Sequence, residues 1–316
     1  MPTDSALPPL LTRMLDNQFE HAFAKSKKEV RRLFHGRNSI IAQWSQVIID
    51  WLPNVIVIRL YDEIDSEKLS ALIHYVAAKE AVTGVLVQQR GRGRDMTFDI
   101  VYGEVPALLF CEESGLTFEI EPLQNQNFGL FLDMRNGRQW LRENAENKKV
   151  LNLFAYTCAF SVAAVAGGAE MVVNVDVSKK ALSVGRRNHQ LNNHHKQHTQ
   201  FMPYDMLKSW SRINKPGPYD IVVIDPPSFQ PGSFVAQNDY AKVLRRLDQL
   251  TNDNALIMAC HNDPAHSSEF VKNLMMQMCP EFEFEQRLAV PQEFHEEDSE
   301  KSLKVMIYKK IAKPSI

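Results

Sequence analysis

The sequence has few of the features that mark secreted or membrane proteins. Four cysteines occur among 316 residues, far apart and without a C-x-x-C pair, which argues against a disulfide framework and against a zinc knuckle. No apolar run approaches the roughly 18 residues that a membrane helix needs. The first residues lack the basic region and cleavage site of a signal peptide. We therefore expect a cytoplasmic protein with reduced thiols and no membrane partner.

The sequence also lacks a strong excess of either charge. Lysine and arginine total 36, aspartate and glutamate total 38, and the net charge is -2, so any contact with nucleic acid must come from local basic patches. The chain is 44% hydrophobic and 23% charged, an ordinary globular composition that excludes a disordered chain, a collagen and a coiled coil. The length indicates about two domains at roughly 150 residues each.

Residues 1–122 predict an N-terminal arm with a helix, followed by a small mixed α/β domain. The candidate strands are rich in β-branched and aromatic residues and are separated by turn residues; they span 46–50, 54–60, 83–88, 97–102 and 116–121. A helix is expected over 66–79, where apolar residues recur at helical spacing. The boundary with the second domain is expected near 122–127.

Residues 123–316 predict an α/β fold with a doubly wound, largely parallel sheet. Short and almost wholly apolar runs suit strands buried on both faces; they span 150–154, 171–176, 221–225 and 255–260. Helical stretches alternate with them, as this fold class requires; they span 159–166, 178–192, 236–251 and 265–278. Two further strands are expected near 283–290 and 302–309.

The turn after the first of these strands lacks the glycine motif of dinucleotide sites. G-x-G-x-x-G lets the backbone approach a pyrophosphate, whereas this turn reads Phe154-Ala155-Tyr156-Thr157-Cys158-Ala159. Its absence argues against a nicotinamide-dependent dehydrogenase. The small side chains of the turn still admit a ligand without phosphate groups.

Acidic residues follow the next two strands. Asp176 lies 24 residues after Asn152, a spacing at which an acid accepts hydrogen bonds from ribose hydroxyls; the alternative is a helix cap near Ser178. Asp205 could accept from an adenine amino group, although a turn aspartate is the default interpretation.

The strongest local motif is Asp225-Pro226-Pro227-Ser228-Phe229, after the fourth strand. The two prolines fix the backbone and remove two donors, Asp225 brings a carboxylate to the sheet edge, and Phe229 could offer a ring to a flat base. The alternative is a rigid loop with a core phenylalanine. A ribose-binding acid without a phosphate loop fits a nucleoside such as S-adenosylmethionine.

These motifs resemble a known family. VLNLFAYTCAFSVAAVAGGA, VVNVDVSKKAL and YDIVVIDPPSF are similar to the class I S-adenosylmethionine-dependent methyltransferases with a Rossmann-like sheet, and most similar to the bacterial 23S rRNA group of cytosine-C5 and guanine-N7 enzymes. FGLFLDMRNGRQW resembles that group's leading segment. The resemblance covers about 128–310, and an N-terminal PUA-type module found in some members is expected to be missing.

The resemblance implies roles for individual residues. The turn would hold the methionine portion of the cofactor, Asp176 the ribose, Asp205 the adenine edge and Asp225 the methionine amino group. The predicted cofactor site consists of Asp133, Arg135, Phe154, Ala155, Tyr156, Thr157, Asp176, Val177, Asp205, Met206, Asp225 and Pro226. Cys158-Ala159 stands where the family usually has Gly-Gly, and these residues tolerate positive φ less well than glycine.

The resemblance leaves two acceptor atoms open. Guanine N7 needs little beyond orientation, whereas cytosine C5 requires a thiolate that adds to C6. Cys260 is the one candidate nucleophile, although a buried cysteine at a strand end is commonly a small hydrophobe. Asn262 could instead bind a base edge. The prediction favours guanine N7 slightly, with Asp225, Phe229 and Cys260 as the candidate catalytic residues.

Three basic groups indicate an RNA partner, and the resemblance implies that this RNA is ribosomal. One cluster precedes the first predicted strand. The second group consists of Arg90, Arg92 and Arg94 in a loop, and the third of Arg245 and Arg246 on a helix. Basic side chains of this kind attract RNA phosphates. The first cluster comprises Lys25, Lys27, Lys28, Arg31, Arg32, His35 and Arg37. The competing class is a non-catalytic RNA-binding protein on a degenerate methyltransferase fold.

The histidines at 189, 194, 195 and 198 look like a metal cluster but lack a cysteine or acidic companion. Methyl transfer from a sulfonium needs no metal, and none is expected. The oligomeric state is not evident from the sequence.

Overall fold

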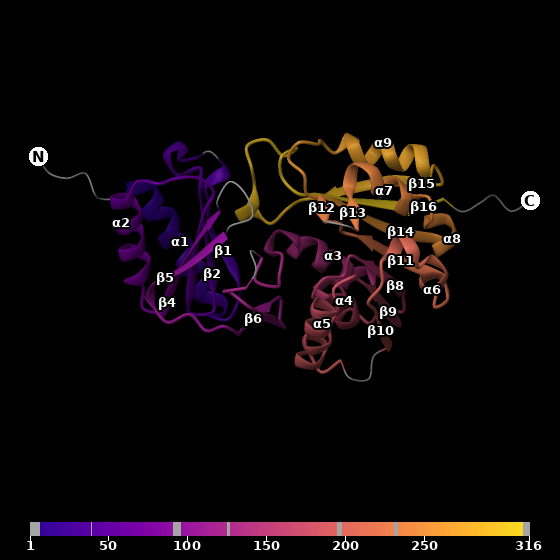
Figure 1. The fold of residues 1–316 in the computed structure, drawn as a ribbon, viewed down its shortest axis with the longest axis horizontal. Helices are drawn as coiled ribbons and strands as arrows, with labels where there is room; N and C mark the ends of the chain where they lie inside the picture. The colour runs from indigo at the N-terminus through magenta and orange to yellow at the C-terminus, as the bar shows by residue number, and fades with distance from the viewer. Residues whose placement is uncertain are drawn as a thin grey trace, which may run out of the picture. The chain divides into compact units, whose positions relative to one another are not determined.

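The computed structural model describes residues 7–38, 40–90, 96–124, 127–194, 198–230 and 233–311. The chain forms two compact units (Figure 1): unit 1 comprises Met1–Leu132 with Gln292–Glu297, and unit 2 comprises Asp133–Pro291 with Asp298–Ile316. The division falls about ten residues after the expected boundary. A short segment from the C-terminal part of the chain thus belongs to the N-terminal unit.

Unit 1 is built on a five-stranded sheet in the order β1-β2-β3-β4-β5. Its strands are β1 (Arg31–His35), β2 (Val47–Leu52), β3 (Val55–Leu60), β4 (Gly84–Arg90) and β5 (Met96–Gly103). Neighbours are antiparallel except β3 and β4, which are parallel and joined through helix α2 (Ser66–Ala77). Helix α1 (Pro9–Lys25) and α2 supply Leu11, Leu15 and Leu72 to the core that covers one face.

Further short elements complete unit 1. A separate hairpin consists of β6 (Leu109–Glu113) and β7 (Leu116–Ile120). The 3₁₀ helices are η1 (Gly36–Asn38), η2 (Ala42–Trp44), η3 (Leu132–Met134), which leads into unit 2, and η5 (Gln292–Phe294). The sequence did not predict β1 and β6, because charged residues interrupt the apolar pattern in both.

The structure contradicts part of the first basic cluster. Arg31–His35 does not precede the first strand but forms it, and Arg32 and His35 are buried. Arg32 Nε donates to Asp50 Oδ1 at 2.9 Å, while Arg31 pairs with Glu29 at 2.8 Å. Arg32 and His35 therefore belong to no surface patch, whereas Lys27 and Lys28 are exposed and the Arg37 side chain keeps 40% exposure.

Asp50 is the centre of a buried ion network in unit 1. Its side chain is fully buried on β2, and Arg32 and Arg59 contact its two oxygens at 2.9 and 2.5 Å. Arg59 Nε donates to Gln88 at 3.0 Å, and its guanidinium lies 4.3 Å from the centre of the Phe128 ring. Burial acts to raise the pKa of Asp50, but the two guanidiniums prevail and hold that pKa below its ordinary value.

Unit 2 is a seven-stranded sheet in the order β10-β9-β8-β11-β14-β16-β15. The strands are β8 (Lys149–Leu153), β9 (Met171–Val175), β10 (His198–Met202), β11 (Tyr219–Ile224), β14 (Thr251–His261), β15 (Phe282–Leu288) and β16 (Lys304–Lys310). The first five in spatial order are parallel, and β16 runs antiparallel between β14 and β15. The predicted doubly wound α/β fold is confirmed.

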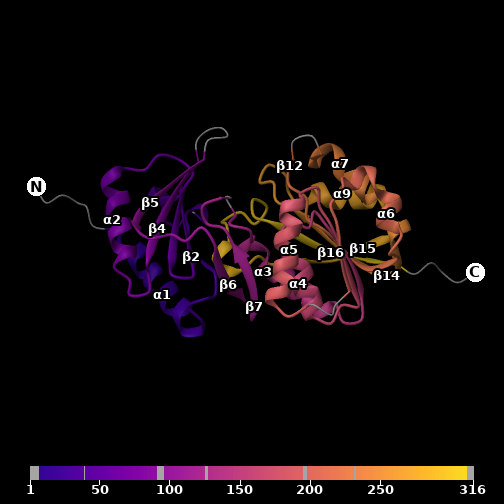
Figure 2. The same ribbon diagram turned by 60° about the horizontal axis from the view of Figure 1, so that its bottom comes forward.

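Helices cover both faces of this sheet (Figure 2). On one side lie α3 (Arg135–Asn144), α4 (Ala159–Ala166) and α5 (Lys179–Leu191); on the other lie α6 (Trp210–Asn214), α7 (Ala236–Leu244), α8 (Leu247–Leu250) and α9 (Glu269–Met278). The helix expected over 236–251 is interrupted at Arg245 and Arg246 and ends earlier. Within the described part of the chain, no helix is long and apolar enough to cross a membrane.

Candidate functional site

The strand order of unit 2 reverses between β8 and β11. Numbered along the chain, the seven strands lie in the order 3-2-1-4-5-7-6, so the connections leave β8 and β11 in opposite directions. A crevice forms outside the carboxyl ends of parallel strands at such a point, and this is where ligands bind in open α/β sheets. The predicted site residues follow these strands.

The turn after β8 is conformationally strained. Phe154, Tyr156 and Cys158 have φ values of 58°, 47° and 62°, in the left-handed region that residues with a Cβ seldom adopt. Such residues cost about 1–3 kcal/mol each and cluster at functional sites. Hydrogen bonds hold the turn, including Cys158 N–H to the Ala155 carbonyl at 2.7 Å.

Gly185 of helix α5 leaves space for Cys158, which stands where the family that the sequence resembles usually has glycine. Cys158 is fully buried, and a Cβ added to Gly185 would lie 2.4 Å from its Sγ and 2.8 Å from its Cβ. The Asn188 side chain, one turn further along α5, donates to the Thr157 carbonyl at 3.0 Å. The departure at Cys158 is therefore accommodated by a glycine on the facing helix.

Asp176 connects the strained turn to the start of α5. Its two oxygens accept from the backbone N–H groups of Tyr156 at 2.9 Å and Ser178 at 2.8 Å, while Ser178 itself caps the helix by accepting from Ala181 N–H. Burial raises the pKa of Asp176, and the two backbone hydrogen bonds oppose that rise. The carboxylate thus fixes the turn and also reaches the pocket described next.

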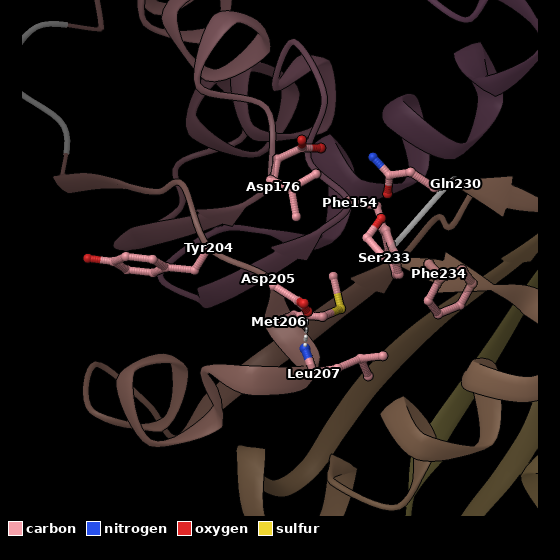
Figure 3. Close-up of a pocket in the computed structure, with 10 residues that line it drawn as sticks. Phe154, Asp176, Tyr204, Asp205, Met206, Leu207, Gln230, Ser233 and Phe234 are labelled. Carbon is pink, nitrogen blue, oxygen red and sulfur yellow. Dashed lines mark hydrogen bonds between the residues drawn. The ribbon is translucent and has the colours of Figure 1, made fainter.

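A pocket that is open to solvent lies at this edge of the sheet (Figure 3). Five of the predicted cofactor residues line it: Phe154, Asp176, Val177, Asp205 and Met206. The sequence analysis missed the other five: Tyr204, Leu207, Gln230, Ser233 and Phe234. Phe234 belongs to β13 (Phe234–Val235), which forms a hairpin with β12 (Phe229–Gln230), and Ser233 directly precedes β13. The turn residues after the double proline could have indicated this hairpin.

The lining suits a flat, uncharged ring and hydroxyl groups. Phe154 and Phe234 meet edge to face with ring centroids 4.7 Å apart, and Met206 and Leu207 add apolar surface. Asp205 Oδ1 accepts from Leu207 N–H at 3.0 Å, so the default role of a turn aspartate is also present. The described lining includes no lysine or arginine, which disfavours a phosphate ligand.

A second acidic group follows β11. Burial raises the pKa of Asp225 to about 7; the nearby Asp133 adds to the rise and Arg138 opposes it. Asp133 and Arg135 stand at the start of α3, and Arg138 is buried on its next turn. The sequence analysis missed Arg138, although its spacing from Arg135 places both on one face of the helix. A carboxyl with so high a pKa would be ionised more readily beside a ligand cation.

The candidate nucleophile Cys260 lies near the end of β14 and is fully buried. Burial raises the pKa of its thiol well above the ordinary value, and Asp225 and Asp133 raise it further. Tyr240, also fully buried, donates from its hydroxyl to the Cys260 carbonyl at 3.0 Å. This setting disfavours the thiolate on which cytosine-C5 chemistry depends.

Several predicted groups do not join the pocket. Ala155 and Thr157 are buried in the turn, and Pro226 follows Asp225.

Other predicted groups lie outside the parts of the chain that the structure describes: the Phe229 side chain, residues 91–95, the Arg90 side chain, residue 195 and the His198 side chain. His189 is buried, with its Nε2 2.9 Å from Ser161 Oγ, and burial lowers its pKa to about 3.

Comparisons with known proteins identify relatives of this chain. A model of the S-adenosylmethionine-dependent methyltransferase family matches residues 31–309. The ribosomal RNA large subunit methyltransferase I of Aeromonas hydrophila is 38% identical over 133 residues, which are 41% of this chain and 34% of that protein. The enzyme of the same name from Escherichia coli O139:H28 is 32% identical over 190 residues, which are 58% and 48% of the two chains.

A solved structure extends the similarity to nearly the whole chain. The methyltransferase SMU.776, complexed with SAH, is 26% identical with a TM-score of 0.81, and the match covers 95% of this chain and 81% of that one. The curated rRNA enzymes match over only about a third to a half of their own length.

Proposed function

The chain belongs to the S-adenosylmethionine-dependent methyltransferase family, and from this we propose that it transfers a methyl group from that donor to ribosomal RNA of the large subunit. The observation that carries the proposal is the pocket at the switch point, where two acids meet apolar and aromatic side chains without a phosphate-binding loop. The similarity of the chain to curated rRNA methyltransferases supports RNA as the substrate.

The residues of unit 2 fit the three parts of the donor. Asp176 would accept hydrogen bonds from the ribose hydroxyls, and Asp205 from the adenine amino group, while Phe154 and Met206, which line the same pocket, would contact the adenine ring. Asp225 would bind the methionine ammonium, and Arg135 its carboxylate. The bound donor supplies a methyl group on a sulfonium, which leaves the protein the tasks of orienting the acceptor and excluding water.

The burial of Cys260 favours a ring nitrogen, guanine N7, over cytosine C5 as the acceptor. A ring nitrogen has an in-plane lone pair and needs no thiolate, whereas the C5 route starts with addition of a thiolate to C6. The raised pKa of the Cys260 thiol acts against that first step. The position of Cys260 beside Asp225 keeps the C5 route as the alternative that the acceptor experiment decides.

The first experiment measures donor binding by calorimetry. We expect the parent to bind S-adenosylmethionine and Asp176→Ala to lose affinity by about 10–100-fold, as removal of hydrogen bonds to a charged group does. Asp253→Ala, an exposed aspartate on β14, is the matched control and should bind like the parent. An absence of binding in the parent, with Asp176→Ala indistinguishable from it, would favour a non-catalytic RNA-binding protein.

The second experiment identifies the acceptor. Purified protein is incubated with rRNA from a strain that lacks the gene, and the methylated nucleosides are resolved by mass spectrometry. We expect a methylated guanine and retained activity in Cys260→Ala. Complete loss of activity in that variant, together with a trapped covalent RNA adduct in the parent, would overturn the ring-nitrogen assignment in favour of C5.

A further inference from the structure

Two histidines and an aspartate come together just beyond β14, apart from the pocket of Figure 3. His261 is the last residue of β14, and Asp263 and His266 lie in the loop that leads to α9. One possible ligand atom from each residue lies within 4.8 Å of the other two. Imidazole nitrogen and carboxylate oxygen together form a common ligand set for zinc and related cations.

The distances between the ligand atoms are close to those of a tetrahedral metal site. His261 Nε2 and His266 Nδ1 are 3.2 Å apart, and His266 Nδ1 lies 3.5 Å from Asp263 Oδ2. In a tetrahedral site with bonds of about 2.0–2.1 Å, two ligand atoms lie about 3.3–3.4 Å apart. The third pair, His261 and Asp263, lies within 4.8 Å, which small side-chain rotations can adjust.

Neighbouring groups hold the three side chains in place. Asp263 Oδ1 accepts from Ala265 N–H at 2.9 Å, which leaves Oδ2 toward His266. The Gln237 side-chain nitrogen lies 3.2 Å from His266 Nε2, the ring nitrogen opposite the proposed ligand atom; the Gln237 amide turns over so that its oxygen accepts from this nitrogen when His266 Nδ1 binds the cation. The Phe270 ring packs on both imidazoles, with centroids 4.7 Å away in each case. Such outer contacts orient ligands in known metal sites.

We propose that His261, Asp263 and His266 bind one divalent transition-metal cation of the zinc type, with solvent in the fourth position. The His266 and Asp263 side chains keep 22% and 25% exposure, so a cation can approach from solvent, while His261 forms the buried end of the site. Each imidazole would carry its single proton on the nitrogen that does not ligate, and on His266 that nitrogen faces Gln237.

The loop at this site follows the candidate nucleophile. Asn262 lies between two of the ligands, and its carbonyl accepts from Ser228 Oγ of the Asp-Pro-Pro-Ser loop at 3.2 Å. On β16, the buried Lys304 donates to the Asp263 carbonyl at 2.8 Å; its positive charge acts against a cation, and its hydrogen bond fixes the loop. A bound metal would hold the segment after Cys260 without taking part in donor binding.

The test titrates the metal-free parent with Co²⁺ and Zn²⁺. We expect one site per chain, visible absorption of tetrahedral intensity with Co²⁺, and displacement of Co²⁺ by Zn²⁺. His266→Ala and Asp263→Asn should weaken binding by at least about 10–100-fold, the loss that changes around metal ligands already cause. Both should bind S-adenosylmethionine like the parent, which shows that they are folded and separates this test from that of the proposed function.

Two control variants locate the binding. His74→Ala removes a histidine on α2 in unit 1, and His194→Ala removes the partner of His189 in the other imidazole pair, whose Nδ1 atoms are also 3.2 Å apart. Both should bind metal like the parent. No binding by the parent, or loss of binding in His194→Ala but not in His266→Ala, would overturn the proposal.

Discussion

One aspartate in each unit has an electrostatic setting opposite to that of the other. Asp50 lies within β2 of unit 1 between Arg32 and Arg59, and these guanidiniums hold its pKa below the ordinary value. Asp225 follows β11 of unit 2, where burial and Asp133 raise its pKa to about 7. Asp50 is fully buried and Asp225 is half-buried, but only Asp50 is matched by positive charge strong enough to offset the loss of water contact.

The difference distinguishes a stabilising carboxylate from one kept for a ligand. The network around Asp50 supports the folded state of unit 1. At the edge of the unit 2 sheet, here called its rim, burial disfavours the ionised form of Asp225, and the turn after β8 contains three residues with left-handed φ values. Strain and raised pKa values are retained where a ligand relieves them. The comparison predicts that substitutions destabilise unit 1 and can stabilise the rim of unit 2.

The largest effect is expected for Asp50→Ala. Removal of the carboxylate leaves two buried guanidiniums without their counter-charge, a change that costs about 3–5 kcal/mol. Hydrogen exchange of the β2 and β3 amides should accelerate accordingly, while exchange in β8 and β11 of unit 2 stays close to that of the parent.

Asp99→Ala is the matched control for this substitution. Asp99 is an exposed aspartate on β5 of the same sheet, and its replacement should change stability by less than about 0.5 kcal/mol. Equal exchange rates in Asp50→Ala and Asp99→Ala would show that the buried network does not stabilise unit 1.

A smaller effect is expected for Gly185→Ala in unit 2. The added Cβ would lie 2.4 Å from Cys158 Sγ, and overpacking of this kind costs about 1–3 kcal/mol. The strained turn must then shift, so the affinity for S-adenosylmethionine should fall as well. The second substitution Cys158→Gly should restore both, because it removes the colliding atoms and glycine accepts the φ of 62°.

Gly137→Ala separates this clash from a general effect of alanine in a helix. A Cβ at Gly137 in α3 would meet its nearest neighbour at 3.5 Å, an ordinary contact, so that variant should gain about 0.5–1 kcal/mol from helix propensity. Failure of Cys158→Gly to rescue Gly185→Ala would show that the collision with Cys158 is not the cause of the loss.

The fold of unit 2 could be predicted from sequence because its strands are buried on both faces. Runs such as 150–154 and 221–225 are apolar along their whole length, which few other structures require. In unit 1, β1 carries Arg32 and His35 inward, where Asp50 pairs with Arg32 and Glu296 with His35. Both partners are distant in sequence and invisible to a local pattern, so residues of a buried strand are counted in a basic cluster.

The pocket could be predicted only in part, for a similar reason. Asp176 and Asp205 follow strands, and the topology brings strand ends together. Phe234 and Gln230 reach the pocket through the hairpin of β12 and β13, and the turn residues after the double proline are its local signal in the sequence. Gly185 is seven residues into α5 and acquires its role only because Cys158 lies opposite.

The smallest expected effect concerns the stability of the ligand-free protein in Asp225→Asn. The folded pKa of about 7 lies above the ordinary value of 3.8, so the folded state binds more protons than the unfolded state between these values, and stability falls as the pH rises through that window. Asparagine carries no such proton. A pKa rise from 3.8 to about 7 would correspond in full to roughly 4 kcal/mol, but Asp225 is only half-buried and solvent screens it. The variant should therefore equal the parent near pH 4 and exceed it by about 1 kcal/mol at pH 8, a rise in Tm of about 2–4 °C.

The same substitution should act in the opposite direction on ligand binding. A methionine ammonium beside Asp225 stabilises the ionised carboxylate, so the parent's affinity for S-adenosylmethionine should rise between pH 6 and 8, whereas that of Asp225→Asn should be weak and independent of pH over this range. Thermal unfolding with and without the donor measures both effects in one series. A variant that is less stable than the parent at pH 8 would contradict the view that this carboxyl is kept at a cost for its ligand, and would make it a structural acid like Asp50.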